Sequence, residues 1–209
     1  GAHPGYADRV HFGRIELRLT CQELADSVFE QVETFAQIAA TCSATVAHVK
    51  AHGALYNQAA RDPKTAQAFA DGVARWRTGA GRTYSPLQAK DVVMIGLAGS
   101  PMLDIFREAG FSIAAEAFAD RRYEPDGSLR SRKFDDALIL DPAEAAAQAL
   151  RIAERGSVIA CNGAEITVNA DTICVHGDTH GAPQIAAAIA SALHEAGITP
   201  RALRANPRL

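Results

Sequence analysis

The sequence predicts an α/β protein in which a mainly parallel sheet forms an open or incomplete β/α barrel. Apolar strand patterns alternate with helical patterns along the chain, which is typical of parallel sheets. The apolar run at residues 92–97 is nearly uninterrupted, as expected of a strand covered on both faces. Five main strands can be counted, and the first, at residues 1–5, reads as the end of a longer strand. Five strands are fewer than a closed eight-stranded barrel needs.

The first helix is expected to begin after Thr20. Thr20 and Glu23 fit a capping box, in which each side chain satisfies a free backbone donor at the helix start. Apolar residues then recur at helical spacing as far as about Thr41. A central strand follows at residues 45–51, and Gly53 is expected to allow a tight turn directly after it.

A second helix start is marked by Asp62 and Pro63, which suit the N-cap and the first helical position. Residues 78–90 are rich in glycine and polar residues and are expected to form a long loop. The strand at residues 92–97 leads into a short helix that ends near Gly110, and the next strand is expected at residues 113–118.

The remaining elements are predicted from turn residues, cap residues and apolar periodicity. They are a β-ribbon arm at 129–134, a helix from Asp141 to Gly156, a hairpin around Asn162 and Gly163, a strand at 172–176, a helix at 183–196 and a weakly ordered tail at 199–209.

Composition excludes several classes of protein. A chain of 209 residues is long enough for one sizeable core. Its formal net charge of -3 gives no electrostatic basis for binding nucleic acid, and no apolar run approaches the length of a membrane span. The four cysteines show no CxxC spacing and are interpreted as reduced thiols, so the protein is expected in the cytoplasm.

Histidines recur near three predicted strand ends, at His3, His52 and His176. Lys50 lies two residues before His52 and would project to the same side of an extended chain. An isolated pair of this kind is commonly just a partly exposed strand end. Because parallel barrels collect their site residues at strand ends, the recurrence favours one shared site. The candidate residues are His3, Lys50, His52, Glu116, Asp120, Arg121, His176 and Asp178.

Three chemical uses of these residues compete. Histidines with a carboxylate could hold a metal ion that activates water. Lys50 and His52 could instead polarise a carbonyl while a carboxylate acts as base, or the residues could bind a ligand without chemistry. Structural explanations also stay open, since His176 and Asp178 can form a helix-start turn and Glu116 can be a paired structural carboxylate. The sequence contains neither HExxH nor a P-loop motif, so it gives no sign of binding ATP by itself.

Five segments carry a resemblance to a known family. They are GAHPGYADRVHFGR (1–14), HVKAHGALYNQAARDP (48–63), GLAGS (96–100), EAFADRRYEPDGSLRSR (116–132) and CVHGDTHGAP (174–183). In these segments the chain resembles the LamB/YcsF lactam-utilisation proteins, described as the A subunit of prokaryotic 5-oxoprolinase. The resemblance implies a distorted, seven-stranded β/α barrel of the polysaccharide-deacetylase-like type.

The chain departs from the family pattern at its start and at two single positions. The family begins with segments of DLNxDxGEGFG and NIACGFHAGD type, and neither is present here. The resemblance therefore implies that residues 1–209 form a single, N-terminally incomplete barrel domain that lacks the first two βα units. Ala51 and His180 stand where the family has proline, which changes the local backbone but removes no reacting group.

The resemblance also implies a function. The chain is expected to hydrolyse 5-oxo-L-proline to L-glutamate in an ATP-dependent reaction, together with partner subunits B and C. ATP is expected to act through the complex, and a divalent metal ion is left open. The expected catalytic residues are Lys50, His52, Glu116, His176 and Asp178, and the expected substrate-binding residues are His3, Asp120 and Arg121.

Within that scheme, Lys50 and Arg121 would stabilise negative charge, Glu116 or Asp178 would act as base, and His52 or His176 would donate a proton. Two other functions stay open. One is a metal-dependent, deacetylase-like amide hydrolase that needs no ATP. The other is a non-catalytic subunit that binds 5-oxoproline.

Overall fold

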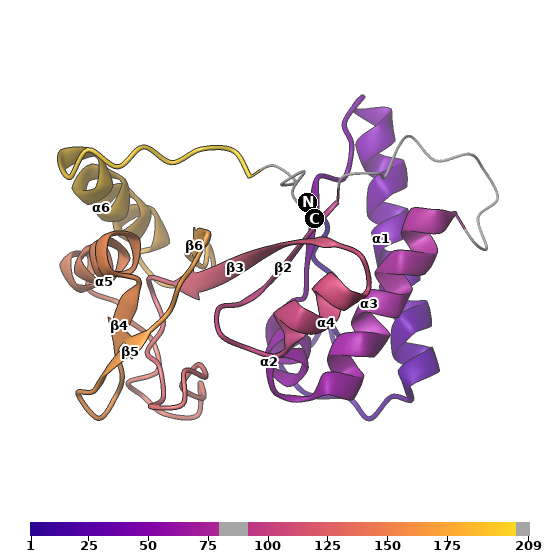
Figure 1. The fold of residues 1–209 in the computed structure, drawn as a ribbon, viewed down its shortest axis with the longest axis horizontal. Coiled ribbons are helices and arrows are strands. Elements are labelled where there is room, and N and C mark those ends of the chain that lie inside the picture. Colours follow the sequence, from indigo (N-terminus) through magenta and orange to yellow (C-terminus); the bar gives the residue numbers. More distant parts are fainter. Residues whose placement is uncertain (80–91, 204–209) are drawn as a thin grey trace. The chain divides into compact units, whose positions relative to one another are not determined.

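The computed structural model describes residues 1–79 and 92–203, and the described chain divides into two compact units. The first unit comprises Gly1–Ala114 without the undescribed segment, and the second comprises Ala115–Leu203 (Figure 1). Most of the predicted loop at residues 78–90 and the end of the predicted tail lie outside the described residues. The prediction of a single barrel domain stays a prediction. Among the described residues no helix is long and apolar enough to cross a bilayer.

The first unit contains four helices and two strands among its described residues, and a third strand begins in it. These elements are α1 (Cys21–Thr41), β1 (His48–Lys50), α2 (Gly53–Arg61), α3 (Pro63–Thr78), β2 (Val93–Leu97), α4 (Met102–Glu108) and the start of β3 (Ser112–Phe118).

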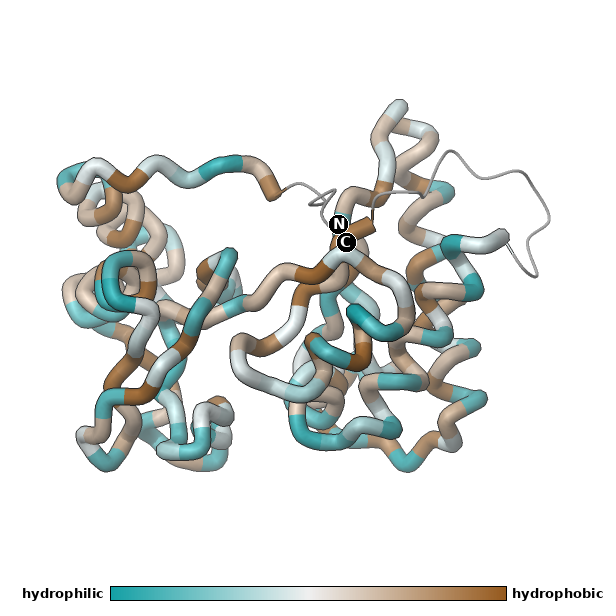
Figure 2. Tube along the Cα trace, in the orientation of Figure 1, coloured by the Kyte–Doolittle hydropathy of each residue, from teal (hydrophilic) through white to brown (hydrophobic). Residues whose placement is uncertain are grey.

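Helices α1 and α3 pack side by side in the first unit (Figure 1). Gly72 permits this close packing, because a Cβ atom there would lie 2.5 Å from the carbonyl oxygen of Ala25. The predicted caps are present, since Thr20 and Glu23 form the capping box of α1 and Asp62 caps α3. Hydrophobic and hydrophilic residues alternate along these helices (Figure 2), as amphipathic helices require.

The sheet of the first unit is parallel where the pairing is defined. Strand β1 pairs with β2 so that Val49 lies opposite Met94, and every residue of β2 is buried, as predicted. Ala2 forms an isolated parallel bridge to Val49, so residues near the start of the chain run alongside β1. The strand order of the four-stranded sheet is β1-β2-β3-β6.

The second unit contains the end of β3 and five further elements. These are α5 (Pro142–Arg155), β4 (Ser157–Ile159), β5 (Glu165–Thr167), β6 (Thr172–Cys174) and α6 (Ala182–Glu195). Strands β3 and β6 pair in parallel, while β4 and β5 form the predicted antiparallel hairpin.

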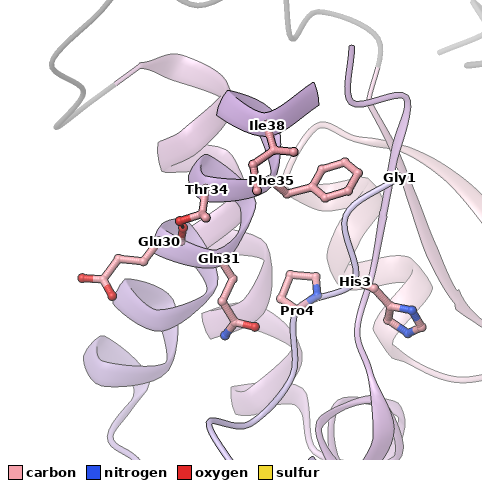
Figure 3. A pocket seen from close by; sticks show the side chains of 8 residues that line it. All are labelled: Gly1, His3, Pro4, Glu30, Gln31, Thr34, Phe35 and Ile38. Atoms are coloured by element: carbon pink, nitrogen blue, oxygen red, sulfur yellow. Dashed lines mark hydrogen bonds between the residues drawn. The ribbon is translucent and has the colours of Figure 1, made fainter. Parts of the chain in front are cut away.

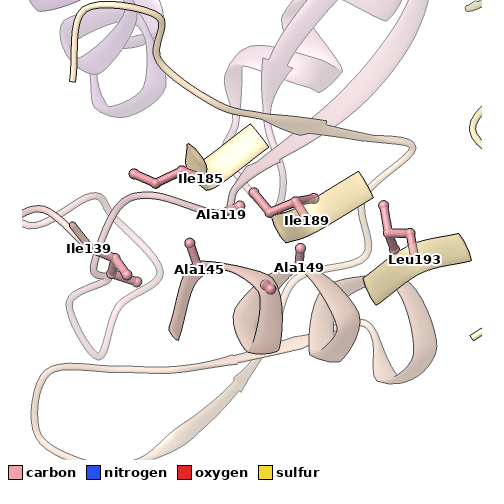
Figure 4. Close-up of a cluster of buried hydrophobic side chains, with 8 residues drawn as sticks. Ala119, Ile139, Ala145, Ala149, Ile185, Ile189 and Leu193 are labelled. Carbon is pink, nitrogen blue, oxygen red and sulfur yellow. The ribbon is translucent and has the colours of Figure 1, made fainter. Parts of the chain in front are cut away.

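The core of the second unit lies between α5 and α6. Helix α5 contributes small side chains such as Ala145 and Ala149, and α6 contributes Ile185, Ile189 and Leu193 (Figure 4). Methyl-sized side chains on one helix let the larger side chains of the other approach its backbone closely. Burial of these apolar groups is the main favourable term for the unit.

Several elements differ from the sequence-based predictions. Gly53 has the positive φ angle of a tight turn, as expected, but it also begins helix α2, which was not predicted. Residues 129–134 do not form a β-ribbon arm, because the pairing there is limited to an isolated bridge between Leu129 and Tyr123. Strands β1 and β6 are shorter than predicted, because β1 runs only from His48 to Lys50 and β6 ends at Cys174.

Candidate functional site

The second unit pairs Asp120 with His176, and the strand register explains why. Phe118 lies opposite Cys174 in the parallel pair of β3 and β6, so the residues two positions further along also face each other. The backbone N–H of His176 donates to Asp120 Oδ2 at 2.9 Å, and His176 Nδ1 lies 3.0 Å from both carboxylate oxygens. Two polar side chains from distant segments thus form one hydrogen-bonded pair.

Asp120 is completely buried, with 0% of its surface exposed. Burial raises the pKa of this carboxyl, but the hydrogen bonds and charge of His176 lower the pKa by more, so it lies below its ordinary value. The Thr179 hydroxyl also donates to Oδ2, at 3.5 Å. The carboxylate is therefore held ionised beside the imidazole.

This pairing fixes which nitrogen of His176 is available for proton transfer. A carboxylate only accepts hydrogen bonds, so the ring nitrogen that faces Asp120, Nδ1, carries a proton. In the neutral ring the lone pair is then on Nε2. The ring of Phe118 stacks on the imidazole with centroids 5.6 Å apart and planes inclined by 18°. His176 is therefore oriented both by a carboxylate and by an aromatic face.

Arg121 follows Asp120 and is also buried. Its Nε donates to the carbonyl oxygen of Ala137 at 3.3 Å, and its Nη2 donates to the carbonyl oxygen of Arg130 at 2.6 Å. These bonds tie the segment after β3 together. The structure thus gives Arg121 a scaffolding role, and the predicted substrate contact stays a prediction.

Glu116 lies within β3 and is only 4% exposed. The fully buried Tyr123 accepts a hydrogen bond through its hydroxyl oxygen from the backbone N–H of Phe118, at 2.7 Å. Burial raises the pKa of Tyr123 far above its ordinary value, and the negative charge of Glu116 adds to this shift. Tyr123 is therefore a neutral phenol, and its hydroxyl holds the backbone of Phe118, the residue that stacks on His176.

Asp178 is exposed in the turn that follows His176, before α6 begins. Within residues 1–79 and 92–203, no group of three or more His, Cys, Asp or Glu side chains is arranged to hold a metal ion.

The first unit orients His52 in a different way. His52 follows β1 by two residues and is the N-cap of α2. Its Nε2 lies 2.8 Å from the backbone carbonyl oxygen of Phe12, which only accepts, so Nε2 carries the proton. The rings of His3 and Phe12 meet the imidazole edge-on at 4.9 and 5.0 Å between centroids. A Cβ at Gly13 would lie 3.1 Å from this ring, so the loop closes tightly around it.

Lys50 ends β1 and is half-buried. Its Nζ lies 5.8 Å from the ring centroid of Tyr56, within range of a cation–π interaction. A cavity of about 580 Å³ in this unit is lined by residues near the start of the chain, including His3 and Pro4, and by α1 side chains such as Phe35 and Ile38. The imidazole of His3 points away from α1 in this view (Figure 3).

The predicted site residues thus form two groups, one in each unit. His3, Lys50 and His52 lie in the first unit, and the remaining five lie in the second. Direct contacts join His3 to His52 and Asp120 to His176. The prediction that all eight residues form one shared site stays a prediction.

Phe118, Tyr123 and Thr179 support the pair of Asp120 and His176 but were not among the predicted site residues. Tyr123 belongs to the EAFADRRYEPDGSLRSR segment, where an aromatic residue after three charged ones was the available signal. Phe118 looks like an ordinary strand residue in the sequence, so its stacking on His176 required the structure.

Comparison with known proteins gives one consistent result. The model of the LamB/YcsF family matches residues 1–207. A protein of Chloroflexus aggregans, named as the A subunit of 5-oxoprolinase, is 45% identical over 98% of this chain and 76% of its own length. A protein of Agrobacterium fabrum, which carries the same name with the number 1, is 40% identical over 99% of this chain and 76% of its own length.

A solved structure shows the same fold. The crystal structure of the lactam utilization protein from Thermus thermophilus superposes with a TM-score of 0.84 and 36% sequence identity. The match covers 97% of this chain and 76% of that one.

Proposed function

Because this chain belongs to the LamB/YcsF family, we propose that it is the A subunit of a 5-oxoprolinase, which opens the lactam ring of 5-oxo-L-proline to give L-glutamate. The observation that carries the proposal is the 45% identity, over 98% of the chain, to a protein named as the A subunit of 5-oxoprolinase. The pair of Asp120 and His176 supports it, because amide hydrolysis needs a group that takes and returns protons.

We assign this proton transfer to His176. Its Nε2 takes a proton from the water that attacks the lactam carbonyl carbon, and the ionised Asp120 stabilises the resulting imidazolium. As the carbon–nitrogen bond of the ring breaks, the imidazolium returns a proton to the leaving nitrogen. The ring-opened product then carries one new carboxylate and one new amine.

The other candidate residues keep the roles proposed for them from the chemistry of lactam opening. Lys50 supplies a positive charge for the oxygen that becomes negative during the reaction, and His52 is a second proton donor. Glu116 and Asp178 are alternative bases. Of these two, Glu116 is buried and Asp178 is exposed.

ATP is assigned to the partner subunits B and C. The sequence contains no P-loop motif, and its residues therefore do not fit that type of phosphate cradle. We derive no step of this chain's chemistry through ATP. The proposed setting of the complex is the cytoplasm.

Glutamate formation from 5-oxo-L-proline and ATP, measured with and without subunits B and C, tests the proposal. Activity that requires all components and falls sharply in a His176→Gln variant supports it. Absence of activity in every combination overturns the assignment. Metal analysis of the same preparation tests the alternative amide hydrolase, which would carry a stoichiometric ion and act without ATP.

A further inference from the structure

We infer that Gln148 is a positioning residue that fixes the backbone from which Asp120 reaches His176. Gln148 lies on α5, and its Nε2 is 2.7 Å from the carbonyl oxygen of Phe118 and 2.8 Å from that of Arg121. The carbonyl oxygen of Ala119 is 3.2 Å from the same nitrogen. One side-chain amide therefore binds the backbone on both sides of Asp120.

The chemistry of these contacts defines the orientation of the amide. All three neighbours are carbonyl oxygens, which only accept, so the NH₂ group and not the oxygen of Gln148 must face them. The group has two hydrogens, which suit the two shorter contacts. The third carbonyl shares them at the longer distance.

The carbonyl of Asp120 itself is held from another side. It accepts a hydrogen bond from the backbone N–H of Ile139, at 3.0 Å. Every carbonyl oxygen from Phe118 to Arg121 thus has a donor, although the chain is leaving the sheet at this point. The last bond to the neighbouring strand runs from Ala119 N–H to the carbonyl of Cys174, at 3.1 Å. Where regular strand pairing ends, the Gln148 amide therefore supplies hydrogen-bond donors that a neighbouring strand no longer provides.

The position of Gln148 on its helix supports a specific role. The neighbouring positions on the same face, one turn before and one turn after, are Ala145 and Ile152, which are buried apolar residues. A polar amide beside such residues is costly unless it is hydrogen-bonded. The three contacts with backbone carbonyl oxygens meet that condition, and they direct the amide of Gln148 toward the segment that carries Asp120.

This inference rests on the proposed function in one respect, namely that His176 transfers protons in lactam opening. Small displacements of a catalytic group reduce the rate strongly because proton transfer depends on alignment. If Gln148 is lost, the carboxylate of Asp120 is no longer held against Nδ1, and the ring of His176 can adopt its other tautomer. That change is visible without any assay of activity.

The test compares Gln148→Met, which keeps the side-chain length but lacks the donors, with Ala147→Met on the exposed side of the same helix. Nitrogen-15 NMR of histidine-labelled protein, with His176 assigned by a His176→Gln variant, reports the tautomer of the neutral ring. We expect the Nδ1–H form in the wild type and in Ala147→Met, and a mixture of tautomers in Gln148→Met. With the partner subunits present, we expect kcat to fall about 10- to 100-fold in Gln148→Met, with KM changed less than threefold.

An unchanged tautomer in a folded Gln148→Met variant overturns the inference, as does an unchanged kcat. If that variant does not fold, Gln148→Asn, which keeps the amide but withdraws it by one methylene, is judged by the same criteria. Failure of both variants to fold means that Gln148 supports the fold and not the pair, which also overturns the inference. If the wild type shows no 5-oxoprolinase activity, the proposed function fails, while the NMR result still decides the role of Gln148.

Discussion

His52 and His176 occupy matching positions in their units and yet are oriented in opposite ways. Each follows a strand by two residues and precedes a glycine. His176 is held through Nδ1 by the buried carboxylate of Asp120, whereas His52 is held through Nε2 by the carbonyl of Phe12. The same local sequence pattern therefore leaves opposite ring nitrogens available.

The difference also concerns charge. An ionised carboxylate stabilises a protonated imidazole, while a neutral carbonyl offers only its dipole. His176 is therefore suited to take up a proton and return it. His52 is bound to a loop whose Phe12 and Gly13 have positive φ angles, so its ring also secures that loop. The partner of each histidine, and not the strand-end motif, therefore decides its chemistry.

The largest expected effect is that of Asp120→Asn. The amide removes the negative charge and lets His176 adopt the wrong tautomer, so we expect turnover in the complex to fall by about 10²- to 10⁴-fold. Steady-state kinetics of 5-oxoproline hydrolysis measures this. A loss of less than tenfold would contradict the conclusion that the carboxylate of Asp120 decides the chemistry of His176.

A smaller effect is expected for His52→Ala. If His52 is a second proton donor, turnover should fall by about 10²-fold, the lower end of general acid catalysis. His11→Ala is the matched control, because His11 lies exposed in the same loop and pairs locally with Asp8. Turnover within threefold of the wild type for His52→Ala would reduce His52 to a support of the loop.

Gly53→Ala tests how tightly the loop around His52 is packed in the first unit. The φ angle of Gly53 is 59°, and a Cβ there would lie 2.5 Å from the carbonyl oxygen of Gly13. We expect the free energy of unfolding to fall by about 2 to 3 kcal/mol, from strain and from the clash together. Gly99→Ala has a similar positive φ but nothing within 4 Å, so it should cost only about 1 to 2 kcal/mol. Equal losses in chemical denaturation would mean that the contact with Gly13 is unimportant.

The stability that Asp120 contributes is expected to depend on pH. The pKa of Asp120 is lowered in the folded state, so this carboxyl contributes stability above its unfolded pKa, and the contribution is lost as the pH falls through its folded pKa. The stability advantage of the wild type over Asp120→Asn should therefore be full at neutral pH and shrink below about pH 4. Urea denaturation across this range measures it, and an advantage that grows in acid would refute the assignment.

Elements with local signals could be predicted from the sequence. The capping box at Thr20 and the Asp-Pro starts at Asp62 and Asp141 specify their helices through neighbouring residues, and all three helices are present. Helix α2 could not be predicted in this way. Its first residue, Gly53, depends on a close approach to Gly13, which is far away in the sequence.

The members of the candidate site could be named from the sequence, but their pairing could not. Asp120 and His176 come together because Phe118 and Cys174 share a register in the sheet, and register is a property of long-range pairing. Gln148 was missed altogether. A single glutamine within an alanine-rich helix was its only signal, and its partners are main-chain oxygens that carry no sequence identity.

The alanine-rich face of α5 has a consequence for how freely this region can change. Ala145 and Ala149 lie in one buried cluster with Ala119, the residue after β3, and the Gln148 side chain reaches the carbonyl oxygen of Phe118 at the end of that strand. The length of the glutamine side chain matches the distance from α5 to this carbonyl oxygen, so neither can change without the other. A bulkier residue at Ala145 or Ala149 would widen the gap beyond the reach of the amide. Substitutions at these core positions are therefore constrained by the residue at position 148.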